Sequence, residues 1–410
     1  MKNLLVEGVL ADVDGVRRGR VRIEEGTIVE VGDSSGKPDL VFGDDCLVFA
    51  GMGDVHIHAR DDVSRKECHK ETFATAAAAA LHGGVVHVAD MPNNPVAPVD
   101  DALYNEKESL VRRGAFPVHF TLYAGIGPGT KPLTRTVPYK AYMAPSHGSL
   151  HFSTLDEIDE TLAFYQGEAV SFHCEDPLIL KAKANEATHE LRRPPEAEIS
   201  ATKFALNMIE KHGLTGKLCH YSVGEGLELI ADAKSRGVPV TAEVTPHHLY
   251  FDTSMISPAN RTIMAMNPPL RSPPDREAML NALRDGLIDY LATDHAPHTP
   301  MEKAKGAPGL PHLDTYGMFV TWLLVDQGFA PERIAEVCSA NPGWFVNPYC
   351  KEQFGRIQPG YVGSLTVLNL KKPHSVHRSE LRTLCGWSPF DGMTFPGSVE
   401  AVVIRGQLIG

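Results

Sequence analysis

The sequence lacks several features that would assign it to other classes of protein. Its seven cysteines are scattered and form no Cys-x-x-Cys pair. This odd set predicts reduced thiols in an intracellular protein rather than a disulfide framework. No apolar run approaches the ~20 residues of a membrane-spanning helix, and residues 1–10 lack the length and cleavage signature of a signal peptide. We therefore expect a cytoplasmic protein with no membrane partner.

Positive charge is also scarce. The 410 residues carry 39 Lys and Arg against 51 Asp and Glu, a formal net charge of −12. Nucleic-acid binding needs a basic surface to neutralise phosphates, so we expect no nucleic-acid partner. A small anionic substrate remains compatible, because one arginine can dominate a pocket. No glycine-rich dinucleotide or phosphate loop follows any expected strand, which disfavours a nucleotide-binding fold.

Both ends of the chain are rich in short strands. Glycines punctuate apolar segments over residues 1–50, and similar segments occur at 364–369 and 399–404. This pattern predicts strands without helices at either end. We expect one small β-sandwich domain assembled from residues 1–50 and 355–410, with a different domain over residues 51–354.

The middle of the chain alternates between strands and helices. Helical patterns occupy, for example, residues 71–82, 155–165, 197–212, 226–236 and 275–285. They separate eight expected strands: one ending at His58, and those over 85–89, 118–122, 139–143, 169–173, 217–221, 238–243 and 290–293. Alternation predicts an α/β fold with a parallel sheet, and eight units suit a closed (β/α)8 TIM-like barrel. The alternative is an open doubly wound sheet.

Residues suited to metal binding follow several of these strands. His56 and His58 are two residues apart, so in a strand both imidazoles lie on one face. Taken alone the pair could be incidental, but barrel strand ends converge on one mouth. Imidazole and carboxylate are good zinc ligands, whereas a lysine would first have to become a carbamate by reaction with carbon dioxide. The other strand-end candidates are Lys140, His173, His220 and Asp294.

The ordered set of motifs resembles the dihydroorotases, a cyclic-amide hydrolase family of the amidohydrolase superfamily, over nearly the whole chain. Each motif alone is modest, and the set is highly specific. The motifs are His56-Ile57-His58-Ala59-Arg60, Asp90-Met91-Pro92-Asn93-Asn94-Pro95, Lys140, Phe172-His173-Cys174-Glu175, His220-Tyr221-Ser222, Asn267-Pro268-Pro269-Leu270-Arg271 and Thr293-Asp294-His295-Ala296-Pro297-His298.

The resemblance implies a site with two zinc ions. By this comparison His56, His58 and Asp294 bind the more buried ion, His173 and His220 bind the second, and N6-carboxylated Lys140 bridges them. A hydroxide between the metals would be the nucleophile, with Asp294 as the proton shuttle. The implied reaction is the reversible cyclisation of N-carbamoyl-L-aspartate to (S)-dihydroorotate and water, a step of de novo pyrimidine biosynthesis.

Substrate contacts are implied in the same way. Arg60, Asn93 and His298 match positions that hold the substrate carboxylate, and Asn267 matches the position at the ring amide edge. A planar guanidinium suits a carboxylate. Arg60 argues against hydantoinases, dihydropyrimidinases and allantoinases. Without the motif, Arg60 would be interpreted as a loop arginine paired with the neighbouring Asp61 and Asp62.

Some residues depart from the family pattern. The arginine is followed by Asp61-Asp62-Val63 rather than Glu-Pro-Gly, and Asn94 replaces a threonine. These changes bear on fine substrate contacts more than on the reaction class. Besides a different cyclic-amide hydrolase, a non-catalytic homologue that scaffolds a pathway partner is an alternative. A homodimer and an association with aspartate carbamoyltransferase are further hypotheses.

Several residues beside the proposed ligands are expected to have supporting roles. Cys174 and Cys219 adjoin ligand histidines, and because neighbours on a strand face opposite sides, both should pack behind the barrel. His247 and His248 should support the site rather than bind metal. Asp90 could orient a ligand histidine or could hold two strands together.

Overall fold

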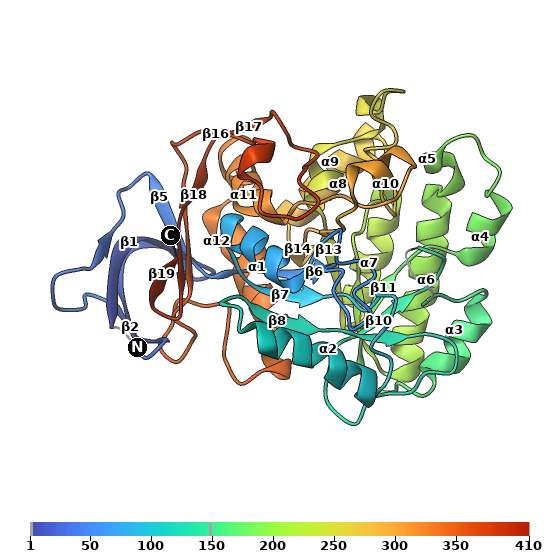
Figure 1. Cartoon of the computed structure of the whole chain (residues 1–410), viewed down its shortest axis with the longest axis horizontal. Coiled ribbons are helices and arrows are strands. Elements are labelled where there is room, and N and C mark those ends of the chain that lie inside the picture. Colours follow the sequence, from blue (N-terminus) through green and yellow to red (C-terminus); the bar gives the residue numbers. More distant parts are fainter. Residues whose placement is uncertain (1–2, 147–149, 410) are drawn as a thin grey trace.

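Parallel strands from the middle of the chain form a barrel in the computed structural model, which describes residues 3–146 and 150–409 (Figure 1). One sheet has the order β6-β7-β8 and another the order β14-β13-β12-β11-β10-β9. Only Tyr123 separates β8 from β9, so these two are parts of one barrel strand. The strands are β6 (Met52–Ile57), β7 (Val85–Asp90), β8 (His119–Leu122), β9 (Ala124–Ile126), β10 (Tyr139–Tyr142), β11 (Ala169–His173), β12 (Thr215–Leu218), β13 (Val240–Val244) and β14 (Tyr290–Leu291).

Contacts between the first and last barrel strands close the barrel. The backbone N–H of His58 donates to the carbonyl oxygen of His295 at 2.8 Å. The N–H of Thr293 donates to Oδ1 of the buried Asp54 at 3.1 Å. The prediction of a closed α/β barrel is therefore confirmed, and the open doubly wound sheet is excluded.

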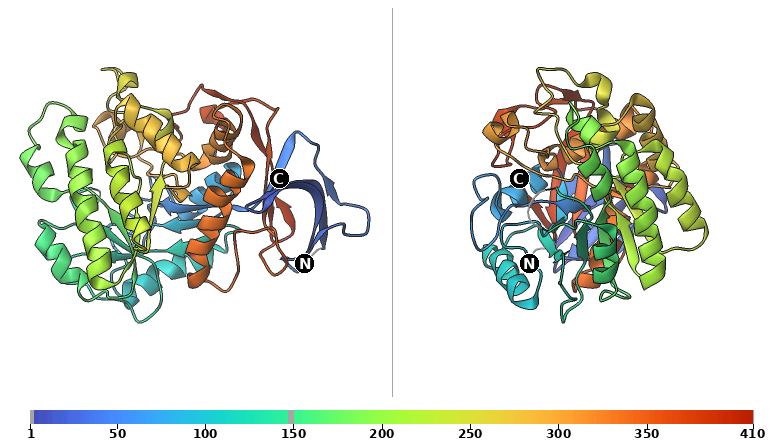
Figure 2. Two further views of the ribbon diagram at one scale, coloured as in Figure 1. Left: turned by 180° about the vertical axis from the view of Figure 1, so that it is seen from behind. Right: turned by 90° about the vertical axis from the view of Figure 1, so that its right-hand side faces the viewer.

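Helices surround the barrel, as the two rotated views show (Figure 2). Side-chain caps define several of their starts: Thr72 accepts from the N–H of Thr75, and Ser272 from that of Asp275, each in a capping box. The helices are α1 (Phe73–His82), α2 (Asp101–Gly114), α3 (Leu155–Leu162), α4 (Pro177–Ala182), α5 (His189–Arg192), α6 (Pro195–His212), α7 (Leu227–Ser235), α8 (Pro246–Tyr250), α9 (Pro273–Arg284), α10 (Pro300–Ala304), α11 (Tyr316–Val325), α12 (Pro331–Ala335) and α13 (Asn341–Val346).

A separate, mostly antiparallel sheet combines both ends of the chain, as predicted. Its order is β19-β18-β15-β5-β1-β2-β3, with β4 beside β1. Alternating apolar residues such as Val6, Val21, Val48 and Leu365 form its core. The strands are β1 (Leu4–Asp12), β2 (Gly15–Glu24), β3 (Thr27–Gly32), β4 (Leu40–Val41), β5 (Cys46–Ala50), β15 (Leu365–Asn369), β18 (Ser398–Ile404) and β19 (Gln407–Ile409).

The C-terminal segment between β15 and β18 leaves this sheet and packs on the barrel. It contains the short strands β16 (His374–Ser375) and β17 (Thr394–Phe395). The ring of Phe390 stacks on that of Phe251, with centroids 5.3 Å apart. Trp387 Nε1 donates to the carbonyl oxygen of His298 at 2.7 Å. Residues 355–410 thus contribute to both parts of the fold, and the boundaries at 50 and 355 remain a prediction.

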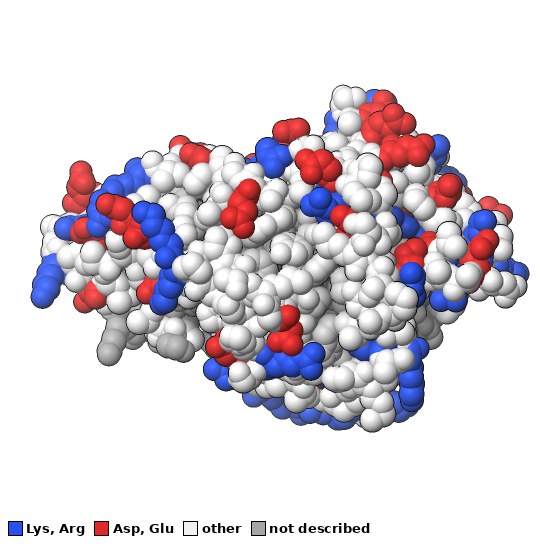
Figure 3. Space-filling view, turned by 90° about the horizontal axis from the view of Figure 1, so that it is seen from above, with Lys and Arg blue, Asp and Glu red and all other residues white. Residues whose placement is uncertain are grey.

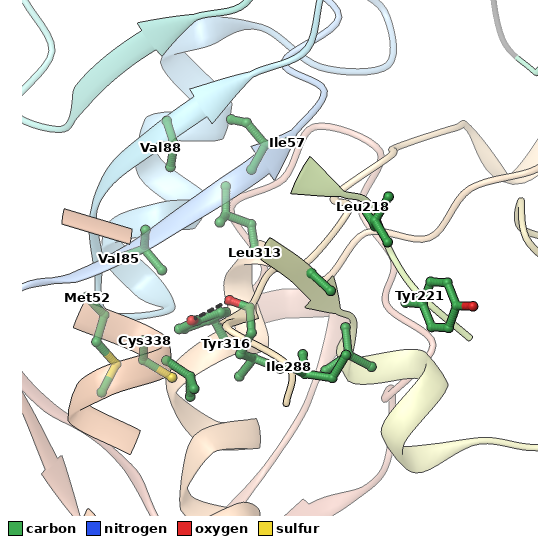
Figure 4. Close-up of a cluster of buried hydrophobic side chains, with 14 of the residues drawn as sticks. Met52, Ile57, Val85, Val88, Leu218, Tyr221, Ile288, Leu313, Tyr316 and Cys338 are labelled. Carbon is green, nitrogen blue, oxygen red and sulfur yellow. Dashed lines mark hydrogen bonds between the residues drawn. The ribbon is translucent and has the colours of Figure 1, made fainter. Parts of the chain in front are cut away.

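A continuous apolar core fixes the barrel beneath its mouth. Met52 and Ile57 of β6 and Val85 of β7 are fully buried and pack in the cluster drawn in Figure 4. Tyr316 belongs to the same cluster, and its hydroxyl donates to the carbonyl oxygen of Leu291 at 2.9 Å. Burial of such side chains contributes about 1.5–3 kcal/mol each, so the strands that carry the site residues start from a rigid base.

The surface carries charges of both signs. On the face in Figure 3 they lie mainly around the rim, and the middle is largely uncharged. Among the described residues, no helix is both long enough and apolar enough to span a bilayer.

Candidate metal centre and substrate pocket

Three predicted metal ligands converge at the mouth of the barrel. Oδ1 of Asp294 lies 3.1 Å from Nε2 of His56 and 2.9 Å from Nε2 of His58. The histidines come from the end of β6, and Asp294 follows β14, its neighbour across the barrel closure. All three side chains are buried. Their ligating atoms lie within 4.8 Å of one another, so the trio can hold one metal ion.

A second predicted pair adjoins this trio. Nδ1 of His173 lies 2.9 Å from Nε2 of His220. The ring centroids of His220 and His56 are 5.3 Å apart, which brings the two groups into one centre. Nδ1 of His220 is buried and has no hydrogen-bond partner among the described residues. The pair offers two imidazole nitrogens for a second ion, which would need a further ligand.

Lys140 lies beneath this centre. Its side chain is fully buried, and its Nζ lies 2.7 Å from Sγ of Cys219. The prediction that Cys219 packs behind the barrel is therefore wrong. His220 has a left-handed φ of +37°, so the alternation of strand side chains breaks there, and both Cys219 and His220 face the interior. Cys174 packs in the apolar core, in agreement with its prediction.

Three of the four ligand histidines have an oxygen partner on the other ring nitrogen. Asn93 Oδ1 lies 2.7 Å from Nδ1 of His58, and Glu175 Oε2 lies 2.6 Å from Nε2 of His173. Glu243 contacts Nδ1 of His56. A carboxylate or amide oxygen accepts the proton at that position, so the nitrogen facing the centre keeps its lone pair for a metal.

Glu243 and its neighbour Lys217 were missed by the sequence analysis. Both are buried, on β13 and β12, and they form an ion pair. Burial would raise the pKa of Glu243, but the charges of His56 and Lys217 outweigh it and lower the pKa to about 2. Glu243 also accepts the backbone N–H of His220 at 3.0 Å. A charged residue within each of two short, mostly buried strands was the available signal.

The three groups of the trio differ in protonation state. Burial would raise the pKa of Asp294, but the charge of His56 and hydrogen bonds from both histidines outweigh it and hold the pKa well below its usual range. Burial lowers the pKa of His58 to about 3, so its imidazole is neutral. An ionised carboxylate and a neutral imidazole are the protonation states that bind a metal. Burial would lower the pKa of His56, but the charges of Glu243 and Asp294 outweigh it and raise the pKa well above its ordinary value, so a metal would displace a proton from this imidazole.

Backbone strain is concentrated at this site. Arg60, His220 and Asp294 have φ values of +55°, +37° and +47°. Non-glycine residues in this region cost of order 1–3 kcal/mol each and persist where the surrounding structure enforces them. At these three strand ends the left-handed backbone directs the side chain towards the mouth of the barrel.

Three of the four predicted substrate residues line the same cavity, and the fourth, His298, lies beside Arg60. Arg60, Asn93 and Asn267 form part of its wall together with the metal-ligand candidates. Nη2 of Arg60 lies 3.5 Å from Nε2 of His298. Nε and Nη1 of Arg60, and Oδ1 of Asn267, are buried without a hydrogen-bond partner among the described residues. These polar atoms are available to a ligand.

The aspartates beside Arg60 have other partners. Asp61 pairs with Arg65 at 2.6 Å, and Asp62 accepts the N–H of Val96 at 2.8 Å. The interpretation of Arg60 as a loop residue paired with them is therefore wrong.

Asp90 and the later histidines have structural partners. Asp90 pairs with Lys107 at 2.6 Å and accepts the N–H of Ala59 at 2.7 Å. It thus holds the chain after β6 against α2 rather than orienting a histidine. His248 Nε2 lies 3.1 Å from the carbonyl oxygen of Pro268, and His247 Nδ1 lies 2.9 Å from Nε2 of His312.

A second group could also hold a cation. His56, Cys219 and Glu243 bring one ligating atom each within 4.8 Å. In this structure Lys140 already contacts Cys219 and Lys217 already pairs with Glu243. We therefore assign this group to the support of His56, and the trio with Asp294 to metal binding.

Comparison with known proteins gives consistent results. The amidohydrolase family profile matches residues 47–409. Dihydroorotases from Thermococcus kodakarensis and Bacillus licheniformis are each 31% identical to this chain over its whole length, covering 95% and 98% of their own. The dihydroorotase of Pyrococcus furiosus is 30% identical over 95% of this chain and 88% of its own.

Solved structures resemble the fold. L-hydantoinase (dihydropyrimidinase) from Arthrobacter aurescens superposes with a TM-score of 0.89 at 24% identity, covering 100% of this chain and 96% of its own. D-hydantoinase (dihydropyrimidinase) from Thermus sp. has a TM-score of 0.83 at 21% identity, covering 99% of this chain and 94% of its own. At these identities the likeness supports the fold alone.

Proposed function

The chain belongs to the amidohydrolase family, and from that premise we propose that it is a dihydroorotase. It would interconvert N-carbamoyl-L-aspartate and (S)-dihydroorotate in de novo pyrimidine biosynthesis. The full-length relatives at 30–31% identity carry that name. A hydantoinase, dihydropyrimidinase or allantoinase is the second candidate, and no feature of the site favours it.

Arg60 is the observation that carries the proposal. Its guanidinium is 2% exposed and lines the cavity, and two of its three nitrogens have no hydrogen-bond partner among the described residues. Buried guanidinium nitrogens without an acceptor are costly, so an anionic group of the substrate should pair with them. Dihydroorotate has a ring carboxylate, whereas dihydrouracil and hydantoin have none. Asn93 and His298 would assist in holding it, and Asn267 would contact the ring amide edge.

Two zinc ions are the proposed cofactor. His56, His58 and Asp294 would hold one, His173 and His220 the other, and Lys140 would bridge them after carboxylation by carbon dioxide. Metal ions in such a centre lower the pKa of water and polarise the amide carbonyl. The donor set supports this, because it offers the neutral imidazole of His58 and the ionised carboxylate of Asp294. Carboxylation would require Lys140 to leave the thiol of Cys219.

Asp294 is the proposed proton carrier. Its Oδ1 faces both imidazoles at the centre of the cavity. A carboxylate there can accept the proton of the attacking water and deliver it to the leaving ring nitrogen, and can act in the reverse sense during cyclisation. The side chain is 9% exposed, so bulk water has little access to the transferred proton.

Compartment and assembly remain proposals. The free thiols of all seven cysteines are compatible with a cytoplasmic enzyme. A homodimer and an association with aspartate carbamoyltransferase stay hypotheses that light scattering and co-purification can test.

The decisive experiment is a substrate panel with zinc analysis of the same sample. We expect dihydroorotate to be hydrolysed far faster than dihydrouracil, hydantoin or allantoin, with about two zinc ions per chain. Asp294→Asn is the matched inactive control. Faster turnover of hydantoin or allantoin than of dihydroorotate would show that the dihydroorotase assignment is wrong and would favour the second candidate. A folded, inactive protein that stays inactive after zinc and bicarbonate are added would support the scaffold alternative.

A further inference from the structure

Tyr142 has a place in the site that the metal and carboxylate contacts leave unexplained. It ends β10, two residues after Lys140, so both side chains face the barrel interior. Nζ of Lys140 lies 5.2 Å from the centroid of its ring. The ring centroid of His173 is 6.2 Å away on another side. Tyr142 also lines the same cavity as Arg60 and Asp294.

The hydroxyl of Tyr142 is a buried polar group that lacks a hydrogen bond among the described residues. The side chain is 3% exposed, and its oxygen has no hydrogen-bond partner among the described residues. Buried polar atoms are nearly always paired in native proteins, and leaving one unpaired costs about 1–3 kcal/mol. Nε and Nη1 of Arg60, which lines the same cavity, also lack a hydrogen-bond partner among the described residues. Together these atoms form a set of donors without acceptors.

The protonation state makes Tyr142 a donor. A tyrosine hydroxyl carries one proton at neutral pH, because the ordinary pKa of a phenol is about 10. Tyr142 and Arg60 line the same cavity. The missing acceptor is therefore an oxygen-rich, negatively charged group that both side chains can reach.

We propose that the hydroxyl of Tyr142 donates a hydrogen bond to the carboxylate of the substrate, which it holds together with Arg60. This inference rests on the proposed function, because it needs a ring that carries a carboxylate. One carboxylate has two oxygens with several lone pairs and can satisfy both side chains. Tyr142 is then a specificity-determining residue in the wall of the same cavity.

The test is Tyr142→Phe, which removes one oxygen and keeps the ring beside Lys140 and His173. We expect KM for dihydroorotate to rise roughly 10- to 100-fold, with kcat changed less than about threefold and the zinc content unchanged. Tyr165→Phe is the matched control. It removes a buried hydroxyl that bonds Thr130 at 2.8 Å outside the cavity, and its kcat and KM should match the wild type.

A double-mutant cycle with Arg60→Met identifies the group that Tyr142 contacts. If both residues hold one carboxylate, the double variant should lose less kcat/KM than the product of the single losses. Independent losses would overturn the inference, as would a fall in kcat without a rise in KM, which would assign the hydroxyl to the reacting carbonyl. An unchanged Tyr142→Phe enzyme would also overturn it. Failure of the wild type to hydrolyse dihydroorotate would instead refute the proposed function.

Discussion

The buried ion pair of Glu243 and Lys217 should support the metal centre from below. Glu243 contacts Nδ1 of His56 and the backbone N–H of His220, so one carboxylate orients a ligand of each proposed metal ion. Lys217 neutralises this carboxylate inside the barrel. Glu243→Gln keeps the shape and one acceptor oxygen but leaves the ammonium of Lys217 buried without a counter-charge.

The expected magnitude follows from the pKa of Glu243. A fall from the ordinary 4.5 to about 2 corresponds to about 3 kcal/mol of folding free energy. The folded-state pKa is depressed, so this contribution is complete above pH ~4.5 and is lost as the pH falls towards ~2. Breaking one partner of a buried pair typically costs ~3–5 kcal/mol, in agreement. Metal affinity should fall roughly 10- to 100-fold, because His56 loses part of its orientation.

Four proteins provide the measurement: the wild type, Glu243→Gln, Lys217→Met and the double variant. Urea unfolding of the metal-free proteins gives stability, and zinc titration with a competing chelator gives affinity. The double variant replaces the ion pair by a neutral pair, so it should regain most of the stability lost by either single variant. Lys211→Met is the control, since Lys211 pairs with Asp159 at a largely exposed site and should cost less than about 1 kcal/mol.

Three results would contradict this reasoning. Single variants that cost no more than the Lys211 control would mean that the pair contributes nothing to stability. A double variant as unstable as the sum of both single variants would mean that the two residues act separately. Unaltered zinc affinity in Glu243→Gln would mean that Glu243 does not orient His56 for metal binding.

Three further variants test the site. Arg60→Met should raise KM for dihydroorotate roughly 10- to 150-fold, because a charged hydrogen bond is lost, with zinc content intact; full affinity would place the carboxylate elsewhere. Lys140→Ala should lose most activity and the second zinc ion, and elemental analysis showing unchanged zinc would remove its bridging role. Glu175→Gln should weaken the second zinc site roughly 10- to 100-fold, since His173 Nε2 loses its carboxylate partner; equal affinity would make that contact purely structural.

The sequence pattern was sufficient for the architecture and for much of the site. Strand alternation at His56 and His58 is a local property, and barrel topology brings strand ends together wherever they lie in the chain. His173, His220 and Asp294 could therefore be assigned to one mouth before any coordinates. Local alternation failed at Cys219, because the left-handed backbone of His220 turns the chain there.

The segment over residues 370–397 shows the same limit. Its sequence resembles the strand-rich ends, but the aromatic contacts of Phe390 and the hydrogen bond of Trp387 attach it to the barrel. Packing between residues more than eighty positions apart decided this, and no local pattern reports it.

By itself the sequence determined the alternation of strands and helices, the β-rich ends and the ligand types at the strand ends, since these depend on spacing and side-chain chemistry. Only the tertiary structure decided how those ligands are held. Glu243 and His56 are 187 positions apart in the sequence but in contact in the structure. The hydroxyl of Tyr142 is buried without a hydrogen-bond partner among the described residues because the fold places it in the same cavity wall as Arg60 and Asp294. Buried polar side chains that lie close together pair with one another, because an unpaired polar atom costs far more free energy inside the barrel than in water.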